Sequence, residues 1–152
     1  MFKISNVKKI DIDRLARIYM VSYNAEWEKW TFYNSQEMIR YRIKKKLKLK
    51  AVIDWEIVWF LFSDVKPFYY WNILTDWDLV VDPKYQRKWV WKKLLFYWMD
   101  YAQKKLGVKF REFYTFKNSY QYKRYKKLWF WNSERFILMS GNIESIMNNN
   151  KT

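Results

Sequence analysis

Only a few side-chain types in this chain could carry acid–base chemistry. The sequence contains no His and no Cys, which excludes an imidazole base, a thiolate nucleophile and the metal sites that depend on either. Protons must therefore be moved by Asp, Glu, Tyr, Lys, the chain terminus or water. Asp76 and Asp78 are candidates, because the alternation of a strand would place both carboxylates on one face. A solvated strand face would explain the same spacing.

The elements that must position these carboxylates begin with an alternating strand over Phe2–Val7. Asp11 is placed to cap a helix that starts at Ile12. Asn34, with Glu37 three residues later, resembles a capping box for a second helix. The sequence therefore predicts one strand followed by two helices.

Three strands follow without a helix between them, over Leu49–Ile53, Ile57–Val65 and Ile73–Val81. The first two are joined by so short a turn that they must form an antiparallel hairpin. A helix is then expected from about Lys88 to Leu106, ended by a C-cap glycine at position 107.

The last predicted elements are a strand over Phe110–Phe116, a helix over Ser119–Leu128 and a strand over Phe130–Met139. The order β-α-α-β-β-β-α-β-α-β predicts an α/β fold of the α+β kind, with a mixed, partly parallel twisted sheet flanked by helices. A strand–helix–strand crossover makes parallel pairs, so the strand ending at Val81 and the strand from Phe110 should be parallel neighbours. Residues 1–147 are expected to form a single domain and residues 148–152 a frayed polar tail.

The segment Leu79–Leu95 joins the third central strand to the long helix. It resembles the cofactor-binding motif of the GNAT acyltransferase superfamily, which is a strand, a loop of the form Gln/Arg-x-x-Gly-x-Gly/Ala and a helix. Gln86 stands at the first loop position, and Trp89 and Trp91 stand at the two small-residue positions. Small residues are needed there because backbone N–H groups at the helix N-terminus must bind the pyrophosphate of CoA at close range.

Two further segments carry the same resemblance. Asn118–Phe130 is similar to a later family motif, an Asn, a Tyr seven residues on and then Lys-Leu-Gly-Phe. The resemblance implies that Asn118 bonds the cofactor arm and that Tyr125 protonates the departing thiolate. From the residues alone, Asn118 is a helix N-cap and Tyr125 is one of 13 tyrosines. Asp54–Phe60 resembles the family hairpin Asp-Gly-Glu-Ile-Val-Gly-Phe.

The resemblance extends over Lys3–Leu138 and implies an N-acetyltransferase that moves an acetyl group from acetyl-CoA to an amine. It implies Asp76, Asp78 or water as the base, and a backbone N–H near Val80 or Val81 as the donor to the thioester oxygen. It also implies that the parallel strands splay apart at their carboxyl ends around the cofactor. The residues implied to bind acetyl-CoA are Leu79, Val80, Val81, Gln86, Arg87, Lys88, Trp89, Val90, Trp91, Lys92 and Asn118.

Tryptophan replaces glycine at several family positions. The chain has 11 Trp and 2 Gly, whereas average usage gives roughly 11 Gly in this length. We interpret the excess as a decoding error, in which UGA codons that the source organism reads as glycine were translated as tryptophan. Indoles at 89 and 91 would then impair the cofactor loop. The alternative is a genuine, catalytically dead regulatory domain. The positions are Trp55, Trp59, Trp89, Trp91 and Trp129, with Trp30, Trp71 and Trp131 as further candidates.

The net charge of +15, with many aromatics among the cations, keeps a basic nucleic-acid-binding module as the rival function. We attribute most of this charge to compositional drift. There is no long uncharged apolar run and no signal-peptide core, so a cytoplasmic enzyme without membrane contact is expected. Its expected partner is an amine on a small molecule or a protein. A homodimer is left open and no metal is expected.

Overall fold

The computed structural model describes residues 2–25, 29–68, 70–86, 90–112, 115, 117, 120–128, 130 and 132. The chain divides into two compact units, Met1–Phe113 and Tyr114–Thr152, and each is considered by itself. Several predictions fall outside the described residues and stay predictions. They concern Arg87, Lys88, Trp89, Asn118, Trp129, Trp131, most of the strand over Phe130–Met139 and the tail 148–152.

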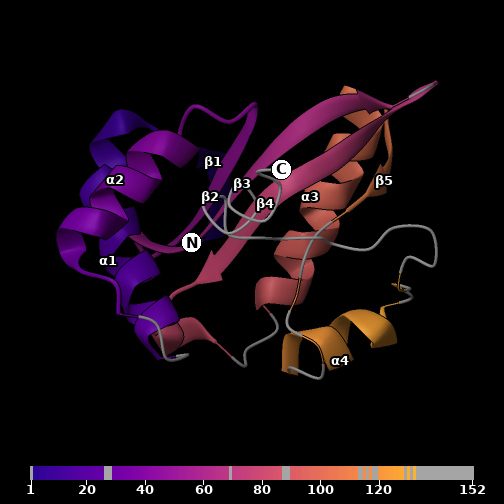
Figure 1. Cartoon of the computed structure of the whole chain (residues 1–152). Helices are drawn as coiled ribbons and strands as arrows, with labels where there is room; N and C mark the ends of the chain where they lie inside the picture. The colour runs from indigo at the N-terminus through magenta and orange to yellow at the C-terminus, as the bar shows by residue number, and fades with distance from the viewer. Residues whose placement is uncertain are drawn as a thin grey trace, which may run out of the picture. The chain divides into compact units, whose positions relative to one another are not determined.

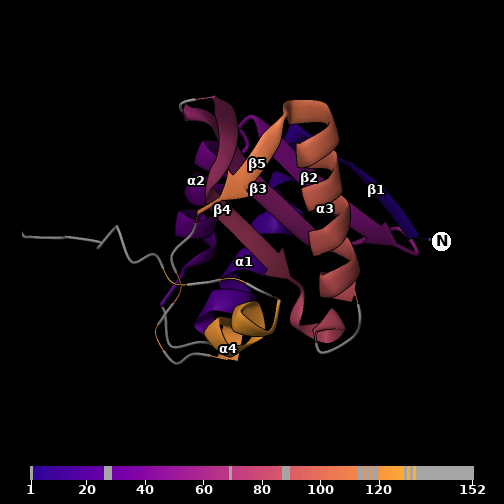
Figure 2. The same cartoon turned by 90° about the vertical axis from the view of Figure 1, so that its right-hand side faces the viewer.

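The described part of the first unit is built on a mixed five-stranded sheet with the strand order β1-β2-β3-β4-β5 (Figures 1 and 2). Neighbours from β1 to β4 are antiparallel, whereas β4 and β5 are parallel. The predicted mixed sheet and the predicted parallel pair are therefore confirmed. The strands are β1 Phe2–Asn6, β2 Leu47–Ile53, β3 Glu56–Phe68, β4 Trp71–Val81 and β5 Val108–Arg111.

Helices cover both faces of this sheet. α1 (Ile12–Asn24) and α2 (Phe32–Arg42) lie on one face and α3 (Val90–Leu106) lies on the other (Figure 1). α4 (Tyr120–Lys127) belongs to the second unit. The order of these elements confirms the predicted β-α-α-β-β-β-α-β-α succession. None of the helices in the described part of the chain combines the length and the apolar composition needed to cross a membrane.

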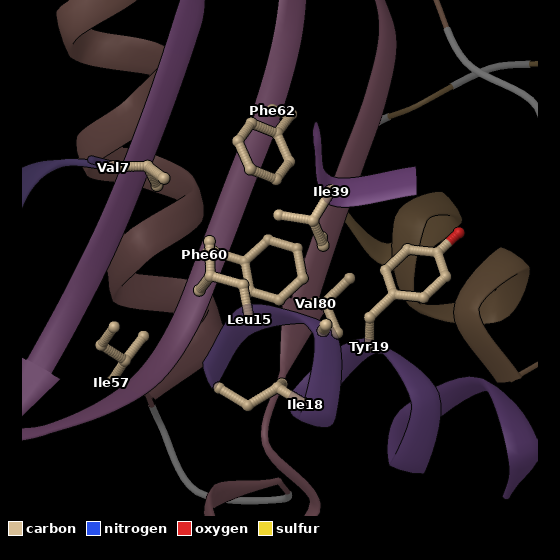
Figure 3. Packing of buried hydrophobic residues seen from close by; sticks show 10 residues of the cluster. Val7, Leu15, Ile18, Tyr19, Ile39, Ile57, Phe60, Phe62 and Val80 are labelled. Carbon is tan, nitrogen blue, oxygen red and sulfur yellow. The ribbon is translucent and has the colours of Figure 1, made fainter. Parts of the chain in front are cut away.

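The main core cluster lies where α1 and α2 pack on β3 and β4. Phe60, Phe62 and Val80 of the sheet meet Leu15 and Ile39 of the helices (Figure 3). The alternate residues of β3, Trp59 and Leu61, are also fully buried. Because successive side chains of a strand point to opposite faces, β3 is covered on both sides, which explains its nearly continuous apolar sequence.

Of the two predicted helix caps, Asp11 stands at the N-cap position of α1 without a side-chain cap bond, and Asn34 is wrong as the N-cap of α2. The Asp11 carboxylate instead accepts the Lys8 N–H at 2.7 Å and pairs with Lys50 Nζ at 2.6 Å. α2 starts before Asn34, because Thr31 Oγ1 accepts the Asn34 N–H at 3.1 Å and serves as the N-cap. Ser, Thr, Asp and Asn all suit an N-cap, so the sequence did not distinguish these candidates.

Left-handed backbone occurs at two junctions in the described residues. Asp54 and Trp55, between β2 and β3, have φ of 46° and 71°. Two positive φ values in a two-residue hairpin are typical of a type I′ turn, which favours Asp-Gly. Gly107, between α3 and β5, has φ of 62° and confirms the predicted C-cap glycine. Position 55 thus has the backbone of a glycine position.

Candidate active site

β4 and β5 pair over a short stretch, and β4 continues beyond it. Asn72 pairs with Val108 and Leu74 pairs with Arg111. The last contact is the Glu112 N–H donating to the Leu74 carbonyl at 2.9 Å. β4 continues to Val81 beside β3, while β5 ends at Arg111. Residues 113, 114 and 116 lie outside the described residues, so the expected splay between the two parallel strands stays a prediction.

The register of β3 and β4 determines which amides of β4 point away from β3. Trp59 pairs with Val81, and the Asp82 N–H donates to the Val58 carbonyl at 2.9 Å. Antiparallel pairs alternate between hydrogen-bonded and non-hydrogen-bonded, so the pairs of Leu79 and Val81 are non-hydrogen-bonded and that of Val80 is hydrogen-bonded. The N–H groups of Leu79 and Val81 consequently point away from β3, while the Val80 N–H points toward it.

A β-bulge lies in the middle of β4. Phe62 pairs with Asp78 and Asp64 pairs with Thr75, so Ser63 alone opposes Asp76 and the residue after it. The simple alternation that would put Asp76 and Asp78 on one face is interrupted here. The side chain of Asp76 lies outside the described set, so its role as a base stays a prediction.

Asp78 is held by an ion pair on the α1/α2 face of the sheet. Its carboxylate lies 2.7 Å from Arg42 Nε, with 16% of the Arg42 side chain and 11% of the Asp78 side chain exposed. The Tyr23 hydroxyl lies 3.4 Å from the other carboxylate oxygen. A base role for Asp78 would therefore require proton transfer through water or release from Arg42.

The loop after β4 is an ordered turn. η2, Pro83–Tyr85, begins at Asp82, whose Oδ1 accepts the Lys84 N–H at 3.0 Å. The Val81 carbonyl accepts Gln86 Nε2 at 3.1 Å. Desolvation and the Glu56 carboxylate, 3.3 Å from the hydroxyl, raise the pKa of Tyr85 above its usual value. The phenol thus stays protonated at neutral pH.

α3 starts at Val90, directly after this loop. Its first N–H groups have no partner within the helix and carry the positive end of the helix dipole. Trp91 is partly exposed and Lys92 is exposed in the first turn. The predicted order of strand, loop and helix N-terminus is confirmed, while residues 87–89 lie outside the described residues.

Tyr125 lies on α4 in the second unit. Its ring contacts Phe130 edge-on, with 5.5 Å between centroids. Its carbonyl accepts the N–H groups of Leu128 at 2.9 Å and Phe130 at 3.1 Å, which ends the helix. The predicted helix is confirmed, and the catalytic role of Tyr125 stays a prediction.

A surface groove of about 430 Å³ lies along α2 and was not predicted from the sequence. Arg42 lines this groove and also pairs with Asp78. The groove therefore leads to the central part of β4. Its lining residues are Trp30, Asn34, Glu37, Met38, Tyr41 and Arg42.

Neither a family model nor a curated protein matches the chain, but solved structures do. A possible acetyltransferase from Clostridium difficile 630 superposes with a TM-score of 0.79 at 14% identity, over 94% of this chain and 99% of that one. A predicted acetyltransferase from Clostridium acetobutylicum, solved with acetyl-CoA, gives 0.69 at 13% over 92% and 96%. A GNAT family acetyltransferase from Staphylococcus aureus gives 0.68 at 12% over 91% and 98%. The chain therefore has the GNAT acetyltransferase fold, as its motifs implied.

Proposed function

We propose that this protein is an N-acetyltransferase that moves the acetyl group of acetyl-CoA to an amine. The observation that carries the proposal is the stretch of β4 beyond Leu74, where the described pairing with β5 has ended. There the Leu79 and Val81 amides point away from β3, and β4 leads through a short turn to the N-terminus of α3. This places strand amides and a helix N-terminus in succession, which suits an extended ligand with a phosphate end.

In this proposal the pantetheine arm of the cosubstrate pairs with Leu79–Val81 like an added strand. The segment 86–92 surrounds the pyrophosphate. The N–H groups at the start of α3, the helix dipole and Lys92 favour the negative charge. Asn118 contributes a hydrogen bond to the cofactor arm.

The chemical step needs a hydrogen-bond donor to the thioester oxygen, a base and an acid. The Val81 N–H is the proposed donor to the thioester oxygen, where negative charge develops. It is preferred over the Val80 N–H, which the register directs toward Phe60 of β3. Asp76 accepts the proton of the attacking amine, or Asp78 does so through water. Tyr125 protonates the departing thiolate.

The groove along α2 is the proposed approach for the amine. Its wall contains the Tyr41 ring, which Arg42 and Lys45 already cover, and the Glu37 carboxylate, which pairs with Arg40. Arg42 also lines the groove and pairs with Asp78 of the strand that would hold the thioester. The amine has to lose a proton before it attacks, and the carboxylates of β4 are suited to receive it.

The test is an acetyl-CoA turnover assay over a panel of small-molecule, peptide N-terminal and lysine amines. The full-length variant with Trp89→Gly and Trp91→Gly is compared with the chain as given. We expect amine-dependent release of CoA thiol by the glycine variant. If it shows neither turnover nor affinity for acetyl-CoA, yet binds single-stranded nucleic acid with a steep salt dependence, the nucleic-acid function is correct instead.

A further inference from the structure

An ion pair joins α1 to the end of β4. Arg14 Nη2 lies 2.7 Å from Asp82 Oδ2, with 37% of the Arg14 side chain and 9% of the Asp82 side chain exposed. The same Arg14 nitrogen donates to the Ile57 carbonyl at 3.2 Å. One guanidinium on α1 thus contacts both β3 and the residue that directly follows β4.

Asp82 connects this pair to the loop before α3. Its Oδ1 accepts the Lys84 N–H at 3.0 Å and its carbonyl accepts the Tyr85 N–H at 2.8 Å. Its own N–H donates to the Val58 carbonyl. Asp82 therefore holds the turn Pro83–Tyr85, and Arg14 holds the Asp82 carboxylate from the opposite side.

We propose that Arg14 is a positioning residue that acts through Asp82 to hold the cofactor loop in its binding geometry. The proposal rests on the proposed function, because it concerns the affinity of that loop for acetyl-CoA. Without Arg14, a mostly buried carboxylate would lose its cation and would turn toward water. The turn that Asp82 caps would move with it.

The experiment uses full-length protein with Trp89→Gly and Trp91→Gly as the reference. We expect Arg14→Ala to raise the Kd and the KM for acetyl-CoA by about 10- to 100-fold, which corresponds to the loss of a hydrogen bond to a charged ligand group, while kcat at saturation stays within about threefold because the lost binding is common to the ground state and the transition state. Arg14→Lys retains the charge but not the two-point contact, and should restore part of the affinity. Arg17→Ala, which removes a neighbouring cation stacked on Phe32 at 4.7 Å, should change neither constant.

A double-mutant cycle with Asp82→Asn tests the route of the effect. If Arg14 acts through Asp82, Arg14→Ala should cause little further loss of affinity for acetyl-CoA in the Asp82→Asn protein. Equal and additive losses would show that Arg14 acts independently of Asp82, and would overturn the positioning role. Thermal unfolding of each variant confirms that affinities are compared among folded proteins. A reference protein that does not bind acetyl-CoA would contradict the proposed function itself. Binding that is unaffected in folded Arg14→Ala would contradict this inference alone.

Discussion

Among the described tryptophans, Trp55 alone has the left-handed backbone that favours glycine. Trp55 has φ of 71° and 98% of its surface exposed. A side chain with a Cβ is strained in this backbone region by about 1–2 kcal/mol, and the exposed indole gains no packing in return. The other described tryptophans have negative φ, and Trp59 is fully buried. The left-handed backbone at position 55 suits glycine, while the misreading hypothesis stays a prediction that rests on the family resemblance.

Replacing Trp55 with glycine should stabilise the protein. The strain relieved is about 1–2 kcal/mol, and the greater freedom of glycine in the unfolded chain offsets roughly 0.4–1 kcal/mol of it. We expect the free energy of unfolding to rise by about 1 kcal/mol, measured by urea denaturation. Trp55→Ala is the matched control, because it removes the indole but keeps the Cβ. Equal stability of the two variants would show that relief of backbone strain does not cause the stabilisation.

Tyr125→Phe should lower kcat in the variant with Trp89→Gly and Trp91→Gly. A general acid contributes ~10²–10⁴-fold, part of which water replaces, so a decrease of roughly 10- to 1000-fold is expected with little change in the Kd for acetyl-CoA. The phenyl ring retains the edge-on contact with Phe130, which should preserve α4. Steady-state kinetics measure the effect. An unchanged kcat would remove Tyr125 from the mechanism.

At the scale of elements, the loop between β4 and α3 depends on backbone groups and therefore on small side chains. In the proposed function, ligand oxygens come within about 2.7–3.2 Å of the amides at the start of α3. Trp91 stands in the first turn of that helix, and the family motif places Trp89 beside it. An indole at either position can occupy the space that the pyrophosphate needs. We therefore expect the affinity of this loop for the pyrophosphate to depend on the volume of the side chains at positions 89 and 91.

The chain as given should bind acetyl-CoA weakly, and the variant with Trp89→Gly and Trp91→Gly should bind it tightly. The helix dipole contributes only about 0.3–1 kcal/mol per charge at an exposed site, which does not offset a steric block. Calorimetric titration at physiological salt compares the two proteins. Equal affinities would argue against both the loop assignment and the misreading hypothesis.

Element boundaries followed from local signals more reliably than caps did. Gly107 and the Asp82–Pro83 pair end α3 and β4 where the sequence predicts. β2 begins at Leu47 and β5 at Val108, each two residues earlier than expected. Strand ends depend on the length of the neighbouring strand, which a single segment does not encode. The bulge at Asp76 could not be predicted for the same reason, because the extra residue is seen only when β4 is paired with β3.

For the whole molecule, the sequence was sufficient to predict the sheet but not the contacts across it. The parallel pairing of β4 with β5 follows from the crossover through α3. The ion pairs Arg42–Asp78 and Arg14–Asp82 do not follow, since each joins residues that are distant in the chain. Such pairs depend on how α1 and α2 are rotated and placed on the sheet. Sequence motifs therefore identified the strand and the loop of the candidate site, whereas its supporting ion pairs required the structure.

The stretch of β4 beyond Leu74 also makes amide hydrogen exchange informative. Val80 belongs to a hydrogen-bonded pair with Phe60, whereas the Leu79 and Val81 amides point away from β3, beyond the described pairing with β5. Exchange should therefore be slow at Val80 and faster at Leu79 and Val81. In the protein with Trp89→Gly and Trp91→Gly, saturating acetyl-CoA should slow Leu79 and Val81 while leaving Val80 unchanged. Uniform slowing along β4 would indicate general stiffening instead. Neighbouring amides of one strand would thus report ligand binding without any attached probe.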